Sequence, residues 1–215
     1  MVAFTLRGPR YNVVLGFAKM TEGKIRLEKR GHERAELQTK AAKAKKTMDK
    51  FQAEKLSVRE ISAADHILMP DFLYHAIFVP PTALRPPMEI TYRPEIYVYI
   101  NGYGKLGDTG AVAEYGGRAV GMVWARLVHA YGHLDDETPE LAISVLPEYR
   151  GMGIGTKLMT KLLDLLAMAG YKRISLSVNK DNPAVRFYHR HGYETICEKE
   201  DDYIMIKEIE VDSRQ

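Results

Sequence analysis

The sequence predicts an α+β protein, in which helices pack against a sheet. One observation is a run of alternating apolar residues that leads through a glycine-rich turn into an amphipathic helix, over residues 140–170. The second is that Gly116-Gly117 and the acidic residues 200–202 each join two apolar runs, as in antiparallel hairpins. A chain of 215 residues is long enough for one domain with a full core and an appendage.

The composition is that of an ordinary soluble protein, with 46% hydrophobic and 27% charged residues. No apolar run approaches the ~20 residues that span a bilayer, and the N-terminus lacks the apolar segment of a signal peptide. We therefore expect a cytoplasmic protein without membrane association. Cys197 is the only cysteine, so neither a disulfide nor a thiolate metal cluster is expected, and Cys197 is predicted to pack in a strand.

Charge separates the first 55 residues from the rest. They hold 14 Lys and Arg against 6 Asp and Glu, whereas residues 56–215 hold 17 against 22. We expect a basic N-terminal arm over residues 1–55, helical or partly disordered, and the folded domain over residues 56–215. The favoured interpretation of the arm is a solvated helix. Contact with nucleic acid or an acidic partner is one alternative, and translation that begins at Met48, with residues 1–47 not native, is another.

The first elements of the domain are predicted to be a strand over residues 56–60 and a helix over residues 62–69, which ends before Pro70. A second helix is expected over residues 72–77 and a short third one over residues 94–99. Aromatic residues are frequent here, which suits an apolar acceptor pocket as well as simple packing on the sheet. They are Phe72, Tyr74, Phe78, Tyr92, Tyr97, Tyr99 and Tyr103.

A β-hairpin is expected over residues 110–128, because the Gly-Gly pair accepts the positive φ of a tight turn. The loop over residues 129–139 is expected to be solvated at a rim. The remaining predicted elements are a strand over residues 173–178, a helix capped by Asn182 and stopped by Gly192, and strands over residues 193–198 and 203–209.

The glycine-rich turn within residues 140–170 predicts a binding site for phosphate. Backbone N–H groups of the turn and of the first helical turn have no acceptor inside the helix. Glycines let a phosphate touch the backbone, and an arginine adds positive charge. These residues are Arg150, Gly151, Gly153 and Gly155.

Two common phosphate motifs do not fit this turn. A Walker A loop needs Gly-Lys followed by Ser or Thr, whereas Gly155 is followed by Thr156 and then Lys157. A dinucleotide-binding fingerprint needs G-x-G-x-x-G after the first strand, whereas this turn reads G-x-G-x-G and lies deep in the chain. Neither a nucleoside triphosphatase nor a dinucleotide-binding protein is therefore favoured.

The pattern Arg-x-x-Gly-x-Gly, formed by Arg150, Gly153 and Gly155 after a strand that ends in Val-x-Pro, resembles the acyl-CoA pyrophosphate loop of the GCN5-related N-acetyltransferase (GNAT) superfamily. A second family signature follows at the expected distance, as Asn182-Pro183-Ala184, Phe187-Tyr188 and Gly192-Tyr193. The resemblance covers about residues 56 to 210. It implies an α/β/α layered fold with a mixed, mostly antiparallel six- to seven-stranded sheet, a central splay and about four flanking helices.

The resemblance implies transfer of an acetyl group from acetyl-CoA, without a metal, to a primary amine of a small molecule or peptide by direct attack in a ternary complex. Tyr188 matches the family's tyrosine that protonates the departing thiolate. Glu140 is the first candidate for the general base, with Asp135, Asp136 and Glu137 behind it, and a mere surface carboxylate is the alternative. Cofactor contacts are implied for Ile143, Val145, Arg150, Gly151, Met152, Gly153, Ile154, Gly155, Thr156, Asn182 and Tyr188.

A non-catalytic acyl-CoA-binding or regulatory module is the alternative function, with the basic arm on nucleic acid or a protein partner. Nucleic acid is the less favoured partner, and a homodimer stays open. Two histidine pairs, His129 with His133 and His189 with His191, have no carboxylate or Cys partner that a metal site needs, so we expect surface histidines.

Overall fold

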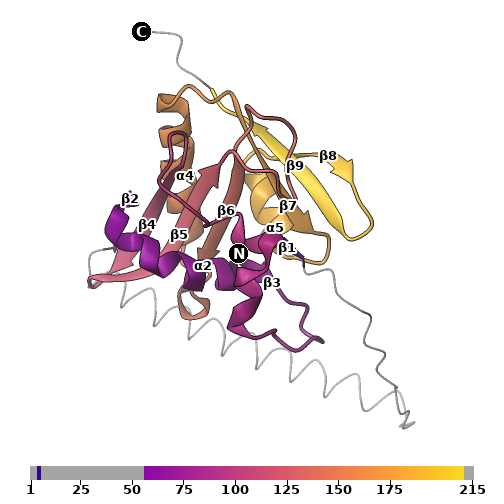
Figure 1. The fold of residues 1–215 in the computed structure, drawn as a ribbon, viewed down its shortest axis with the longest axis horizontal. Helices are drawn as coiled ribbons and strands as arrows, with labels where there is room; N and C mark the ends of the chain where they lie inside the picture. The colour runs from indigo at the N-terminus through magenta and orange to yellow at the C-terminus, as the bar shows by residue number, and fades with distance from the viewer. Residues whose placement is uncertain (1–3, 6–55, 211–215) are drawn as a thin grey trace, which may run out of the picture. The chain divides into compact units, whose positions relative to one another are not determined.

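The computed structural model describes residues 4–5 and 56–210 (Figure 1). The predicted basic arm over residues 1–55 lies outside the described residues, except for residues 4 and 5. Its boundary at residue 55 therefore stays a prediction. The described chain forms a seven-stranded sheet of order β2-β4-β5-β6-β7-β9-β8 and a two-stranded sheet of β1 (Phe4–Thr5) and β3 (Ile77–Phe78). None of the described helices is long and apolar enough to cross a membrane.

The large sheet has two antiparallel halves, which meet where β6 pairs with β7 in the parallel direction. The first half is β2 (Leu56–Glu60), β4 (Thr109–Tyr115), β5 (Arg118–Arg126) and β6 (Glu140–Val145). The second half is β7 (Arg173–Asn179), β9 (Asp202–Glu208) and β8 (Glu194–Glu198). Gly116 and Gly117, at φ of 56° and 77°, make the turn between β4 and β5, as predicted.

The junction between β6 and β7 is parallel, and one residue pair is recorded there, Glu140 with Ser175. The Ser175 N–H donates to the Pro139 carbonyl at 3.0 Å, and beyond this point the two strands no longer pair in the described structure. This confirms the predicted fold class, a mostly antiparallel seven-stranded sheet with a central splay.

Helices cover both faces of this sheet. On one face α2 packs on β6, where Ser144 Oγ donates to the Phe72 carbonyl at 2.7 Å (Figure 1). On the other face α4 covers β4 and β5, and a Cβ added at Gly121 would lie 3.0 Å from Leu158 Cδ1. The helices are η1 (Ala63–Leu68), α2 (Met69–Ala76), η2 (Met88–Tyr92), α3 (Pro94–Tyr97), η3 (Pro147–Tyr149), α4 (Ile154–Met168) and α5 (Ala184–Arg190).

Three local predictions were wrong in detail. Pro70 does not end a helix but lies in the first turn of α2, where a missing N–H leaves no hydrogen bond unmade. Tyr99 lies beyond α3, which ends at Tyr97, and is fully buried in the core. Cys197 lies in a strand as expected, but it is exposed, because β8 is the edge strand of the sheet and all its residues face solvent.

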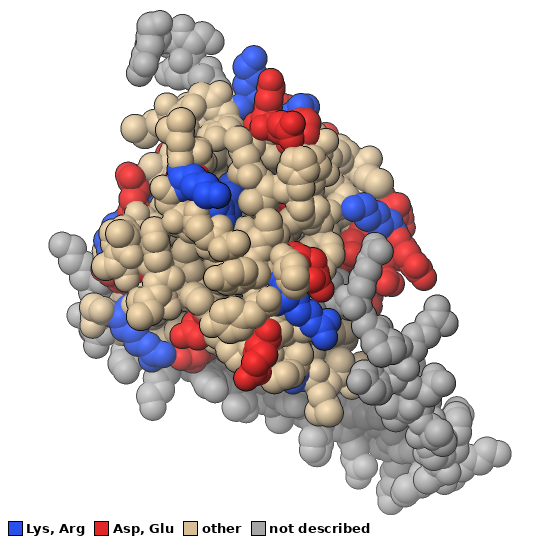
Figure 2. Space-filling model, viewed as in Figure 1, with Lys and Arg blue, Asp and Glu red and all other residues tan. Residues whose placement is uncertain are grey.

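Charged side chains are mixed on the face that Figure 2 shows. Lys and Arg lie among Asp and Glu over the described residues of this face, without a continuous basic surface. Among the described residues several charges are paired, as Arg59 is with both Asp65 and Glu114. This face therefore lacks the unbroken positive potential that attracts a phosphate backbone.

Candidate active site

The glycine-rich turn follows β6 and the short helix η3, and it leads into α4. Gly151 and Gly153 have φ of +79° and +74°, in the left-handed region, and Gly153 immediately precedes the first residue of α4. A Cβ added at either glycine would meet no atom within 4 Å. The turn therefore needs glycine for its backbone conformation and not for lack of space.

The start of α4 presents backbone donors to this turn. The N–H groups of Ile154, Gly155 and Thr156 precede the first helical bond, which Lys157 makes to the Gly153 carbonyl at 3.2 Å. No backbone acceptor is recorded for these three groups in the described part of the chain. Arg150 Nε donates to the Val145 carbonyl at 2.9 Å and so holds the turn against the end of β6. The arrangement offers N–H groups and the positive end of the helix dipole to an anion.

We expect Gly153→Ala to weaken acetyl-CoA binding and Gly155→Ala to leave it nearly unchanged. Alanine in the left-handed region costs about 1–2 kcal/mol, so the free variant is expected to relax to another backbone conformation, and restoring the turn on binding would raise Kd by at most about 5–30-fold. At Gly155, φ is not positive, and a Cβ would only touch the Phe187 ring at 3.4 Å. Isothermal titration of acetyl-CoA into each variant measures this difference. Equal Kd values for the two variants would contradict the role given to the φ of Gly153.

Two backbone amides of β6 face the gap of the splay. The Leu146 N–H donates to Val120, on the β5 side, at 2.9 Å. Because N–H groups alternate along a strand, those of Ile143 and Val145 are directed to the β7 side. The strands no longer pair there, and contacts of Ile143 and Val145 to the cofactor stay a prediction.

Glu140 begins β6 and is 1% exposed. Its Oε1 accepts hydrogen bonds from the Tyr99 hydroxyl and from the Gly132 N–H, the latter at 2.6 Å. Its Oε2 is buried and has no hydrogen-bond partner among the described residues. Burial raises the pKa of Glu140 from 4.5 to about 7, and the bonds from Tyr99 and Gly132 offset burial only in part. The carboxyl group therefore titrates near neutral pH.

The contacts that hold Glu140, from Tyr99 and Gly132, were not predicted from the sequence. Tyr99 lies 41 residues before Glu140 and receives a hydrogen bond from the Tyr131 N–H at 3.2 Å. Gly132 lies in the loop expected to be merely solvated, yet it is buried, and a Cβ there would lie 2.7 Å from the Leu176 carbonyl carbon. The sequence feature that marks this loop is Gly132 between His129 and His133, and this feature alone does not indicate a catalytic site.

The other carboxylates proposed as bases are less suited. Asp135 Oδ2 pairs with Arg173 at 2.6 Å, and hydrogen bonds, Thr138 first among them, lower the pKa of Asp135. Asp136 and Glu137 are exposed to solvent. Of the four candidates, Glu140 combines burial with a raised pKa, which is the pattern of a general base that works near neutral pH.

The raised pKa predicts that Glu140 destabilises the fold at alkaline pH. Between pH 4.5 and 7 the folded protein binds more protons than the unfolded chain. The stability that protonated Glu140 contributes is therefore fully present below pH 4.5 and is lost as the pH rises through 7. We expect the free energy of unfolding of Glu140→Gln, relative to wild type, to rise by about 3 kcal/mol from pH 4.5 to pH 8. Urea unfolding at both pH values measures this change. Glu137→Gln should show no such rise, and an unchanged difference for Glu140→Gln would contradict the pKa.

The second predicted motif lies on α5, beside the start of α4. Asn182 Oδ1 accepts the Ala184 N–H at 2.9 Å, so Asn182 caps the helix as predicted. Tyr188 is fully buried, and its ring packs edge-on against Tyr193 at 5.6 Å between centroids. Burial raises the pKa of Tyr188, so the phenol is protonated at neutral pH. Because the Phe187 ring reaches Gly155, the helix that carries Tyr188 lies beside the glycine-rich turn.

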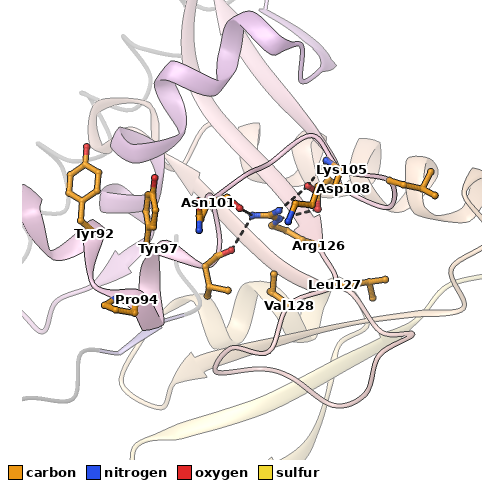
Figure 3. A pocket seen from close by; sticks show the side chains of 11 residues that line it. Tyr92, Pro94, Tyr97, Asn101, Lys105, Asp108, Arg126, Leu127 and Val128 are labelled. Carbon is orange, nitrogen blue, oxygen red and sulfur yellow. Dashed lines mark hydrogen bonds and ion pairs between the residues drawn. The ribbon is translucent and has the colours of Figure 1, made fainter.

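A cavity of about 460 Å³ lies at the other end of β6 from the turn (Figure 3). Arg126 of its wall pairs in register with Glu140, the first residue of β6, although Glu140 itself does not line the cavity. Its base is fixed by the buried Arg126–Asp108 pair at 3.0 Å. Tyr92 and Tyr97, two of the seven aromatic residues, line this cavity, and its use as an acceptor pocket stays a prediction. Its lining is Tyr92, Pro94, Tyr97, Val98, Asn101, Lys105, Leu106, Asp108, Arg126, Leu127 and Val128.

One statement about the histidines was wrong. His129 does have a carboxylate partner, since its Nε2 lies 3.0 Å from Asp136 Oδ1. His133 stacks on His129 with 4.0 Å between ring centroids. The loop brings His129, His133 and Asp136 together, although His129 and Asp136 are seven positions apart in the sequence. Because the loop is irregular, this spacing does not predict the contact.

Solved acetyltransferase structures have a similar fold. The structure of the PaiA N-acetyltransferase from Thermoplasma acidophilum, in complex with coenzyme A, superimposes with a TM-score of 0.55 at 16% identity, over 72% of this chain and 99% of the other. A family model described as "Acetyltransferase (GNAT) family" matches residues 74–193, more than half of the chain. The chain therefore belongs to the GNAT family of acetyltransferases, as the motifs predicted.

Two curated relatives show the range of this family. An L-2,4-diaminobutyric acid acetyltransferase from Nocardia farcinica is 37% identical over 92 residues, 41% of this chain and 44% of the relative. An N-alpha-acetyltransferase 50 from Danio rerio is 30% identical over 105 residues, 48% of this chain and 61% of the relative. The chain thus spans about half of the length of the curated relatives it matches.

Proposed function

We propose that the protein is an acyl-CoA-dependent N-acetyltransferase, which transfers the acetyl group of acetyl-CoA to a primary amine by direct attack in a ternary complex. The observation that carries the proposal is Glu140, a buried carboxyl group of pKa about 7 at the point where β6 and β7 separate. The absence of a long apolar helix among the described residues is consistent with a cytoplasmic enzyme.

Acetyl-CoA would bind along the splay with its pyrophosphate on the turn of Gly151 to Gly155. The N–H groups at the start of α4 and the charge of Arg150 would hold the phosphates. The amides of Ile143 and Val145 would then face the pantetheine and the thioester carbonyl, where a backbone N–H stabilises the oxyanion as the amine attacks. Asn182, Met152, Ile154 and Thr156 would make further contacts to the cofactor.

The acceptor amine must lose a proton before it can attack. An alkylamine has a pKa near 10.4, so deprotonation at pH 7 costs roughly 4–5 kcal/mol. Glu140 Oε2 is the atom without a partner in the described structure, and we assign it as the proton acceptor, through a water molecule since Glu140 is buried. Tyr188, held protonated by burial, would donate a proton to the departing thiolate of CoA.

The acceptor would approach from the cavity beside Glu140. Tyr92, Tyr97 and apolar side chains form its walls, and Lys105 has no ion-pair partner among the described residues (Figure 3). An amine that also carries a carboxylate would place the carboxylate near Lys105. We therefore propose an amino acid or a peptide as the acceptor ahead of a polyamine, whose charges Lys105 would repel.

Thiol release from acetyl-CoA, followed with a chromogenic disulfide, tests both proposals. The acceptors are 2,4-diaminobutyrate, lysine, N-terminal and lysine peptides, and spermidine, each beside a blank without amine. Turnover above blank establishes the acetyltransferase, and a higher kcat/KM for diaminobutyrate or a peptide than for spermidine supports the role of Lys105. Acetyl-CoA that raises the Tm while every acceptor stays at the blank rate would favour the alternative, a non-catalytic acyl-CoA-binding module.

A further inference from the structure

We infer that His129, His133 and Asp136 form a binding site for a divalent transition metal ion such as Zn²⁺, on the loop between β5 and β6. One ligand atom of each residue lies within 4.8 Å of the other two. Two imidazoles and a carboxylate are a ligand set that Zn²⁺ accepts, and three protein ligands leave the fourth position to water. This site is independent of the proposed acetyltransferase activity.

The geometry is close to what the ion requires. Zinc binds imidazole nitrogen and carboxylate oxygen at about 2.0–2.2 Å, which puts neighbouring ligand atoms about 3.4 Å apart in a tetrahedron. His129 Nε2 and Asp136 Oδ1 are already 3.0 Å apart. The side chains of His129 and Asp136 are 77% and 83% exposed, so they can rotate onto an ion without repacking the core, and the ion can enter from solvent.

The backbone of the loop is fixed between the two histidines. The N–H groups of Tyr131 and Gly132 donate to the Tyr99 hydroxyl and to Glu140, and the His133 N–H donates to the Ala130 carbonyl at 3.4 Å. A ligand set on a backbone that is already ordered loses less entropy when the ion binds. An ion held by His129 and Asp136 would brace the loop from its beginning to its end.

The other histidine pair is a matched comparison within the same chain. His189 Nδ1 and His191 Nδ1 each lie within hydrogen-bond distance of a backbone carbonyl, at 3.1 and 2.8 Å. Neither belongs to a group of three ligands, and the His129 cluster is the only such group in the part of the chain that the structure describes. Two further carboxylates, Asp135 and Glu137, flank Asp136 in the sequence and add negative charge to this loop.

Calorimetric titration of the full-length, metal-free protein with zinc chloride tests the site. The expected result is that His133→Gln and Asp136→Asn each raise the zinc Kd at least tenfold, while His189→Gln leaves it unchanged. Zinc should also raise the Tm of the wild type and of His189→Gln but not of the two loop variants. Zinc affinity that is the same in His133→Gln as in the wild type, or no zinc binding by the wild type, would overturn the inference.

Discussion

Glu140→Gln is expected to lower kcat by about 10²–10⁴-fold, the usual contribution of a general base, with little change in the Kd of acetyl-CoA. Glutamine keeps the shape of the side chain and an oxygen for the Gly132 N–H, but it cannot take a proton. In the wild type, kcat should rise with pH through about 7, because the carboxylate form is the active one. This rise should disappear in the variant.

The control for this prediction is Glu137→Gln, which removes the same charge from an exposed position three residues away. We expect its kcat and its pH profile to match the wild type. A Glu140→Gln variant with wild-type kcat at every pH would show that another group, or solvent, takes the proton of the amine. The loss of turnover in Glu137→Gln instead would move the base to the exposed end of the loop.

The environment of Glu140 supports a role for this buried carboxyl group in proton transfer. A carboxylate loses hydration on burial, and this free energy is recovered only when hydrogen bonds replace the lost water. At Glu140 only one oxygen receives hydrogen bonds within the described residues, and the pKa is raised as a result. A purely structural carboxyl group would be expected to have both oxygens paired. The unpaired Oε2 is therefore the physical reason to seek a proton-transfer role here.

Local chemistry explains what could be predicted from the sequence. Gly151 and Gly153 are needed for a left-handed backbone, and the alternating apolar residues of β6 fill one face of a strand that is buried throughout. Such requirements leave a pattern within ten residues of sequence. They were sufficient to predict the turn, the central strand, the helix after it and, with the second motif on α5, the family.

Long-range packing explains what could not be predicted. The contact of Glu140 with Tyr99 and Gly132 joins a strand, the segment after α3 and a loop. No regular spacing in the sequence predicts that these three residues meet. The same holds for His129 and Asp136, whose approach depends on how the loop between β5 and β6 is anchored. In both cases the residues were visible in the sequence, but their partners were decided by tertiary contacts.

Tyr188→Phe is expected to lower kcat by about 100-fold, which is about 2.7 kcal/mol in activation free energy, and to leave the Kd of acetyl-CoA within a few-fold of the wild type. The phenol holds its proton at neutral pH, because burial raises its pKa, and it would donate a hydrogen bond to the thiolate of CoA during collapse of the tetrahedral intermediate. Complete transfer of the proton to a thiolate, whose conjugate acid has a pKa of about 8.5, is uphill and must be coupled to product release. Phenylalanine keeps the ring and its edge-on packing against Tyr193, so the fold should be preserved.

Tyr193→Phe is the matched control, because Tyr193 is equally buried and its hydroxyl donates to Met159 Sδ at 3.5 Å. Loss of that hydroxyl should lower the Tm slightly and leave kcat near the wild-type value. Steady-state kinetics and acetyl-CoA titration of both variants separate the two roles. If Tyr188→Phe and Tyr193→Phe lose turnover equally, the hydroxyl of Tyr188 has only a structural role. The thiolate must then take its proton from water.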